Sequence, residues 1–172
     1  MPLAAFLLLA AAQPEPPRTV NDQIIGKAED YMVAGPDRVC LGSTIIELDA
    51  GETAYLDYLG IHFGGIRVSG RRGTFLVTEG GAWAEPRGEN GFFEDWRGRT
   101  IFRSRRDGRP RYMIYGSFEP DEEEKPIVLV EGDALGRSRD SAILNRIIVS
   151  RDEPSGCRRH FDYGWDLVME GE

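Results

Sequence analysis

The chain has 172 residues, of which 41% are hydrophobic and 29% charged, and its formal net charge is −8. This length and composition are ordinary for one soluble globular domain with a buried core. The acidic balance argues against general nucleic-acid binding, which depends on neutralising phosphates. The 21 glycines and 10 prolines indicate many turns and favour short strands over long helices.

The N-terminus has the pattern of an export signal. An apolar run from Leu3 to Ala12 is too short to span a bilayer, and Ala10 and Ala12 form the small-x-small pattern that a signal peptidase reads. No Lys or Arg precedes the run, so a disordered apolar tail and a misplaced start codon stay open. We predict a periplasmic or secreted protein without a transmembrane anchor, divided into a signal peptide (1–12), a Pro-rich tether (13–19) and a single β-rich domain (20–172).

Residues 19–36, TVNDQIIGKAEDYMVAGP, are predicted to form one amphipathic helix. Asn21 or Asp22 can cap its start, apolar residues recur at helical spacing, and Gly35-Pro36 stop it. We expect this helix to cover one side of a sheet.

The pattern changes to short strand-like runs from residue 39 onward. Glycine-rich turns separate them at intervals of about ten residues, which is typical of an antiparallel meander. Residues 82–98 are predicted to be an irregular loop, 141–150 suit either a helix or a strand, and 163–170 are predicted to add an edge strand. The fold class is therefore mainly β, an antiparallel sandwich or barrel with one N-terminal helix. The strand-like runs are 39–48, 53–59, 61–69, 74–80, 100–105, 111–118 and 126–132.

Cys40 and Cys157 are the only cysteines of the chain. Two cysteines in a small exported domain most often pair, and we predict a disulfide between them. Free thiols are one alternative, and a metal site at Cys157 and His160 is another. No second Cys/His pair stands at the spacing of a zinc site, and the neighbouring arginines oppose a cation. We therefore expect no metal and no cofactor.

Residues 99–111 hold six arginines within thirteen positions. Asp107-Gly108 between two apolar-patterned runs predicts a β-hairpin with a two-residue loop. That loop pairs Arg106 with Arg109, and strand alternation then assigns each side chain to a face. One face carries Phe102, Ser104, Arg106, Arg109, Arg111, Met113 and Tyr115, and the other carries Ile101, Arg103, Arg105, Tyr112 and Ile114.

Both faces of this hairpin are apolar at the base and arginine-rich at the tip. Burying unpaired guanidinium groups is prohibitively costly, so we expect the tip to project into solvent. Two interpretations stay open. Either the acidic residues at 119–124 neutralise the tip, or the tip binds an anionic partner together with aromatic residues of the preceding loop. The second interpretation assigns binding to Arg103, Arg105, Arg106, Arg109, Arg111, Phe92, Phe93 and Trp96.

Short catalytic motifs are absent: the chain has no GxSxG elbow, P-loop, GxGxxG, HExxH, paired CxxC or EF-hand loop. The two histidines are the candidates for acid–base chemistry. Glycines beside His62 leave room for a ligand, and Asp162 is placed to orient His160. Convergence of these histidines with a carboxylate such as Asp57 indicates a hydrolytic or metal-dependent enzyme; otherwise both are surface residues.

The sequence favours a non-enzymatic binding protein of the cell envelope. We expect the Arg-rich hairpin tip and the aromatic loop to dock an acidic protein, or an anionic glycan or lipid headgroup. An envelope hydrolase or metal-dependent enzyme with a histidine–carboxylate site is the first alternative. A carrier that holds a small apolar ligand inside a β-barrel is the second.

Overall fold

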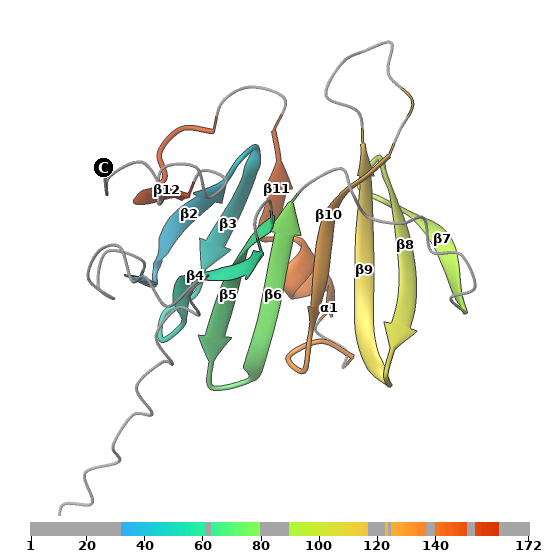
Figure 1. Cartoon of the computed structure of the whole chain (residues 1–172), viewed down its shortest axis with the longest axis horizontal. Helices are drawn as coiled ribbons and strands as arrows, with labels where there is room; N and C mark the ends of the chain where they lie inside the picture. The colour runs from blue at the N-terminus through green and yellow to red at the C-terminus, as the bar shows by residue number, and fades with distance from the viewer. Residues whose placement is uncertain are drawn as a thin grey trace, which may run out of the picture.

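Two β-sheets and one short helix make up the part of the chain that the computed structural model describes, residues 32–60, 63–79, 90–116, 123, 125–136, 140–150 and 154–161 (Figure 1). The predicted mainly β, antiparallel fold is confirmed, with one exception: β12 pairs with β2 in parallel. The elements are β1 (Met32–Ala34), β2 (Asp37–Leu41), β3 (Thr44–Leu48), β4 (Thr53–Gly60), β5 (Phe63–Gly70), β6 (Gly73–Glu79), β7 (Gly91–Trp96), β8 (Arg99–Arg106), β9 (Arg109–Gly116), β10 (Lys125–Gly132), α1 (Asp140–Leu144), β11 (Ile147–Val149) and β12 (Arg159–Phe161).

The larger sheet, sheet A, has eight strands in the order β1-β4-β5-β6-β10-β9-β8-β7. The smaller sheet, sheet B, has four strands in the order β11-β3-β2-β12. Sheet A ends at β1 on one side and at β7 on the other, so the described strands do not close a barrel. Among the described strands, β7 therefore has a neighbour on one side only, and we call its other side the β7 edge.

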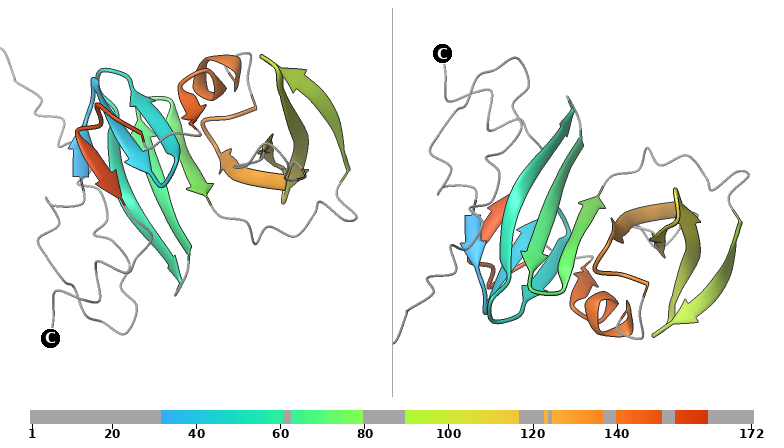
Figure 2. Two further views of the ribbon diagram at one scale, coloured as in Figure 1. Left: turned by 90° about the horizontal axis from the view of Figure 1, so that it is seen from above. Right: turned by 90° about the horizontal axis from the view of Figure 1, so that it is seen from below.

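One apolar core lies between sheet A, sheet B and α1. Sheet B covers the β4–β6 half of sheet A, and the β10-to-β7 half curls so that α1 lies on its concave side (Figure 2). Side chains from all three contribute to one buried cluster, for example Ile46 from sheet B, Val77 and Tyr112 from sheet A, and Leu144 from α1. We call the face of sheet A that lines this core the concave face and the opposite one the convex face.

The convex face carries a second, smaller buried cluster. It consists of Phe102, Met113 and Leu129, with Tyr115 packed against it. These residues lie in register across β8, β9 and β10. Alternation along β8 and β9 thus separates two apolar surfaces, and the arginines nearer the hairpin tip follow the same alternation.

The predicted disulfide between Cys40 and Cys157 is confirmed. The two Cα atoms are 5.9 Å apart, and the residues are 117 positions apart in the chain. Because both sulfurs are in this bond, the free-thiol and metal-ligand alternatives are wrong for these cysteines. The bond attaches the segment leading to β12 to sheet B, where β12 extends the sheet beside β2.

The predicted N-terminal helix is wrong over its last residues. Met32–Ala34 form β1 and pair with β4, because the apolar side chain of Val33 is buried in the core as a strand residue. Residues 19–31 lie outside the described residues, as do the predicted signal peptide and tether. No helix within the described ranges has the length and apolar character needed to cross a bilayer.

Three other local predictions change. The run 39–48 is two strands, β2 and β3, because Gly42 adopts a φ of 52° and lets the chain reverse there. The segment 82–98 is not wholly irregular, since its second part forms β7. The ambiguous segment 141–150 forms both structures in turn, most of α1 and then β11. The edge strand predicted at 163–170 lies outside the described residues.

Candidate functional site

The arginine-rich hairpin has the predicted register. β8 and β9 pair Arg106 with Arg109, Arg103 with Tyr112 and Ile101 with Ile114. The loop residues Asp107 and Gly108 have φ values of 52° and 77°, as a type I′ turn requires at both central positions. The predicted division of side chains between the two faces is therefore confirmed.

The exposed tip of the hairpin is shorter than predicted. Arg105, Arg106 and Arg109 are exposed, but Arg111 is buried, with only 6% of its surface accessible. Arg111 lies opposite Glu131 of the neighbouring strand β10, and its Nε atom is 3.8 Å from that carboxylate. The burial of Arg111 is tolerated because β9 is an interior strand and the neighbouring strand β10 supplies a carboxylate. Strand alternation within the hairpin does not reveal this neighbour.

Arg103 lies on the concave face between two aromatic rings. Its guanidinium carbon is 5.9 Å from the centroid of Phe92 and 5.1 Å from that of Tyr112. One terminal nitrogen donates to Glu94 of β7 at 2.8 Å. Its Nε atom is buried and has no hydrogen-bond partner among the described residues. Arg103 is thus held in a fixed position by cation–π contacts and one ion pair.

The acidic run at 119–124 was one predicted neutraliser of the tip. Only Glu123 of that run is among the described residues, and it is exposed. The neutralising carboxylates that the structure does describe come from neighbouring strands, Glu94 for Arg103 and Glu131 for Arg111. The other residues of the run lie outside the described residues.

The three predicted aromatic residues diverge along β7. Phe92 lies on the concave face over Arg103, whereas Phe93 lies on the convex face, with its ring centroid 4.9 Å from Phe102 and 5.6 Å from Tyr115. Trp96 is half-buried and packs against the main core. The side chains of Phe92 and Phe93 remain 56% and 58% exposed, although each has a partner on its own face.

Arg103, Arg105 and Phe92 converge on one open cleft of about 630 Å³. We call it the arginine cleft. The convex-face arginines Arg106 and Arg109 lie next to it at the hairpin tip but do not line it. The lining residues are Asn90, Gly91, Phe92, Arg103, Ser104, Arg105, Pro110, Tyr112, Gly136 and Asp140.

The floor of the cleft is a buried Tyr112–Asp140 pair. The Tyr112 hydroxyl donates to one oxygen of Asp140, and the backbone N–H of Gly136 donates to the other at 2.7 Å. Burial raises the pKa of Tyr112 well above its ordinary range, and the hydrogen bond with Asp140 raises it further. The phenol therefore remains a proton donor, and the carboxylate oxygens of Asp140 each have a partner.

Sequence reasoning did not single out Tyr112 or Asp140 as site residues. Asp140 precedes the apolar segment SAIL and so has the position of an acidic residue in the first turn of a helix. No local pattern connects that helix start with β9, because the two lie 28 positions apart and meet only in the folded protein.

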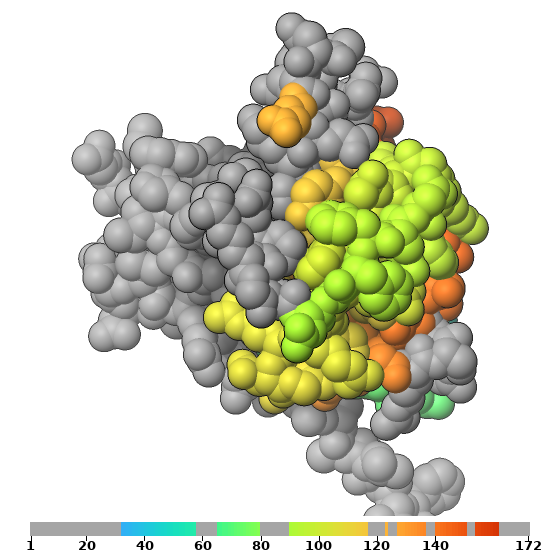
Figure 3. Space-filling view, turned by 90° about the vertical axis from the view of Figure 1, so that its right-hand side faces the viewer, coloured from blue at the N-terminus to red at the C-terminus, as the bar shows by residue number. Residues whose placement is uncertain are grey.

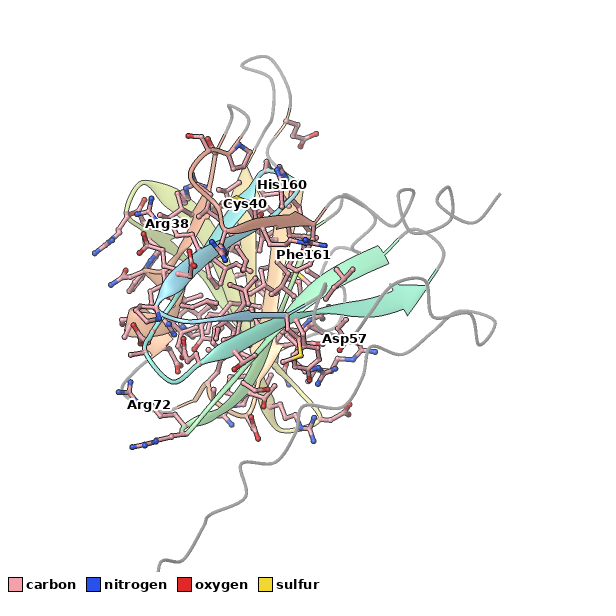
Figure 4. All side chains as sticks on the ribbon, turned by 90° about the vertical axis from the view of Figure 1, so that its left-hand side faces the viewer. Arg38, Cys40, Asp57, Arg72, His160 and Phe161 are labelled. Atoms are coloured by element: carbon pink, nitrogen blue, oxygen red, sulfur yellow. A yellow bond between two sulfur atoms is a disulfide. The ribbon has the colours of Figure 1, made fainter. Side chains whose placement is uncertain are left out.

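The alternative histidine–carboxylate site is not assembled from the residues that the structure describes. His160 lies in β12 with its Nε2 atom 3.0 Å from the carbonyl oxygen of Gly42, whereas Asp57 accepts a hydrogen bond from Arg67 Nε at 2.7 Å. The two residues lie on separate parts of the molecule (Figure 4). His62 and Asp162 lie outside the described residues. Within the described ranges, no three His, Cys, Asp or Glu residues gather to hold a metal ion.

No protein-family model, curated protein or solved structure matches the chain. The chemistry of the arginine cleft therefore carries the functional conclusion.

Proposed function

We propose that the protein is a non-enzymatic binding protein, and that the arginine cleft and the adjoining hairpin tip dock an acidic segment of a partner protein. The observation that carries this proposal is the convergence of Arg103, Arg105 and Phe92 on one open cleft. Arginine and aromatic side chains are the residue types that contribute most at protein interfaces.

The charge at the tip supports an anionic partner. Arg105, Arg106 and Arg109 are exposed around a single acidic residue, Asp107, in a chain whose formal net charge is −8. Among the described residues, neither Arg106 nor Arg109 has an ion pair or hydrogen bond through its side chain, and the two lie opposite each other. A bound carboxylate relieves this like-charge repulsion and accepts paired hydrogen bonds from a guanidinium group.

The groups in the cleft support binding over catalysis. The carboxylate of Asp140 is buried and accepts two hydrogen bonds. Tyr112 has a raised pKa and retains its proton near neutral pH, and both Asp140 oxygens are already engaged by donors of the fold. Arg103 is fixed by Glu94 and its aromatic neighbours, which suits a residue that positions a bound anion.

We further propose that the protein works outside the cytoplasm. A disulfide is compatible with an oxidising compartment, and the apolar run at the N-terminus fits a signal peptide. Mass spectrometry of the protein from its own cells tests this proposal. A mature chain that begins at Gln13 supports export, and a chain that begins at Met1 contradicts it.

Retention on immobilised poly-L-glutamate tests the docking proposal. We expect the protein to bind at low ionic strength and to elute as salt screens the contact. The triple variant Arg105→Ala/Arg106→Ala/Arg109→Ala should elute at much lower salt. The matched control Arg71→Ala/Arg72→Ala/Arg158→Ala removes the same charge from three other exposed positions and should elute like the wild type.

Equal elution of the tip variant and the wild type would contradict docking by the tip. Retention on immobilised heparin or on vesicles of anionic lipid, with none on poly-L-glutamate, would contradict a protein partner. It would instead assign the tip to an anionic glycan or to a lipid headgroup.

A further inference from the structure

β7 is the longest edge strand among the described elements. It has six residues, whereas β1, β11 and β12, the other strands at sheet ends, have three each. Among the described residues, β7 pairs with β8 alone, over its whole length. In Figure 3, β7 crosses the middle of the molecule's face and the β8–β9 tip lies beside it. An edge of this length presents a row of backbone donors and acceptors to a further strand.

Two exposed aromatic side chains flank that edge. Phe92 and Phe93 are consecutive, so they project from opposite faces of sheet A. Each is held in place from its own side, Phe92 by Arg103 and Phe93 by Phe102 and Tyr115. A strand added beside β7 would run between these two rings, which would cover its side chains on both faces and exclude water from the new hydrogen bonds.

The charges along β7 define what such a strand must carry. β7 begins where Gly91 pairs with Ser104, so Arg105 and Arg106 extend beyond one end of the edge. The exposed Arg97 follows its other end. In the middle of β7, Glu94 is paired with Arg103. Asp95, which is also exposed, lies near Arg97, so the edge is cationic only at the end beside the hairpin tip, where Phe92 and Phe93 also lie.

We propose that β7 accepts an extended peptide of the partner as a ninth strand of sheet A, and that this peptide is apolar beside Phe92 and Phe93 and acidic at the end that meets the hairpin tip. Six strand residues span about 20 Å, which sets the length of the segment. This proposal rests on the proposed function, because it identifies the form of the acidic segment that docks beside the hairpin tip.

A second copy of this chain is a poorer occupant. Antiparallel pairing of two β7 edges across a two-fold axis brings Arg97 of each copy toward the arginine tip of the other. The exposed Asp95 offsets Arg97, so this contact brings no net negative charge to the tip, whereas an acidic peptide end does. Charge complementarity therefore favours a peptide of different sequence.

Three labelled synthetic peptides test strand addition against the full-length protein. The first is Glu-Glu-Val-Thr-Val-Thr-Glu-Glu, which presents an acidic end to the tip in either strand direction. The second replaces the central Thr-Val with Pro-Pro, so that at least one N–H directed at β7 is lost in either register, and the third replaces every Glu with Lys. Fluorescence anisotropy measures their dissociation constants. We expect the first peptide to bind, the proline peptide to bind about tenfold more weakly because it loses a ladder hydrogen bond and its extended fit, and the lysine peptide not to bind.

Amide hydrogen exchange locates the contact. Binding of the first peptide should slow exchange at β7 and leave the amides of β1, at the other end of sheet A, unchanged. The variant Phe92→Ala/Phe93→Ala should weaken binding of the first peptide about tenfold or more, since both flanking rings are lost. Thermal unfolding of this variant checks that it is folded. The hydrogen-exchange experiment uses the wild-type protein, so its result does not depend on the folding of the variant.

Equal affinity for the first peptide and its proline version would overturn strand addition, as would unchanged exchange at β7 in the complex. The proposed function would survive either result if the tip variant still lost its retention on poly-L-glutamate. Equal elution of that variant and the wild type would overturn both proposals together.

Discussion

The hydroxyl of Tyr112 donates a hydrogen bond to the carboxylate of Asp140, 28 positions further along the chain. This bond joins β9, an interior strand of sheet A, to the first residue of α1. It also forms the floor of the arginine cleft, directly beneath Arg103, whose guanidinium group lies over the Tyr112 ring. The position of Arg103 therefore depends on a buried hydrogen bond between the neutral Tyr112 hydroxyl and the Asp140 carboxylate.

We expect Tyr112 to resist ionisation while the protein is folded. Burial is the main cause of its raised pKa, and Asp140 contributes through its hydrogen bond and its negative charge. An unfolded tyrosine ionises near pH 10, below the pKa of folded Tyr112. The stabilisation is therefore fully present below about pH 10 and is lost as the pH rises beyond it.

Ultraviolet absorbance titration of the wild type and of Tyr112→Phe checks this prediction. Both proteins should show the same number of tyrosines ionising at ordinary pH, and the wild type should show one more that ionises only at higher pH or on unfolding. A variant that lacks one of the early-titrating tyrosines would contradict the raised pKa.

Removing the Asp140 carboxylate should destabilise the protein. Asp140→Ala leaves the Tyr112 hydroxyl and the Gly136 N–H without their acceptor, which costs about 1–3 kcal/mol for a buried polar group. Asp140→Asn keeps one acceptor and should lose less. Urea denaturation measures both, and Ser141→Ala, an exposed neighbour in α1, should change the free energy of unfolding by less than about 0.5 kcal/mol. A loss for Asp140→Ala no larger than that of Ser141→Ala would show that the pair is not stabilising.

Reducing the Cys40–Cys157 disulfide should lower the free energy of unfolding by about 5 kcal/mol if chain entropy dominates, given a separation of 117 positions. Denaturation with and without a reductant measures the difference. The double variant Cys40→Ala/Cys157→Ala serves as the control, because a reductant should not affect it. An unchanged wild-type midpoint under reducing conditions would argue that the bond constrains the unfolded chain little.

Two ion pairs of the same chain should differ sharply in their contribution to stability. Arg146 bonds both oxygens of Glu52, at 2.5 and 3.1 Å, and the two side chains are only 14% and 17% exposed. Arg38 and Glu47 form a pair at the surface, 51% and 35% exposed. Arg146→Ala leaves a carboxylate largely buried and should cost about 3 kcal/mol, whereas Arg38→Ala should cost less than about 1 kcal/mol. Equal losses in urea denaturation would refute the role assigned to burial.

Local sequence patterns were sufficient for the hairpin and for the disulfide. Asp107-Gly108 specifies a tight reversal because both positions require a positive φ, and a two-residue loop then fixes the register of every pair behind it. The assignment of Arg103 and Arg106 to opposite faces follows from that register alone. The Cys40–Cys157 bond was predictable because the chain offers no other partner for either cysteine.

Contacts between distant segments decided the rest. The sequence does not predict β7, because Phe92 and Phe93 are consecutive and break the alternation of apolar and polar residues. An edge strand that is exposed on both faces does not need this alternation. Arg111 was expected at an exposed tip, yet it is buried, because β10 packs beside β9 and supplies Glu131. The Tyr112–Asp140 floor likewise requires α1 to lie against the concave face. The sequence alone determined the local reversals and the strand alternation, because their causes lie within a few residues. It also determined the cysteine pairing, because the chain has only two cysteines. Only the tertiary structure decided which arginines are buried and which line a cleft, because burial depends on neighbours that no local pattern specifies.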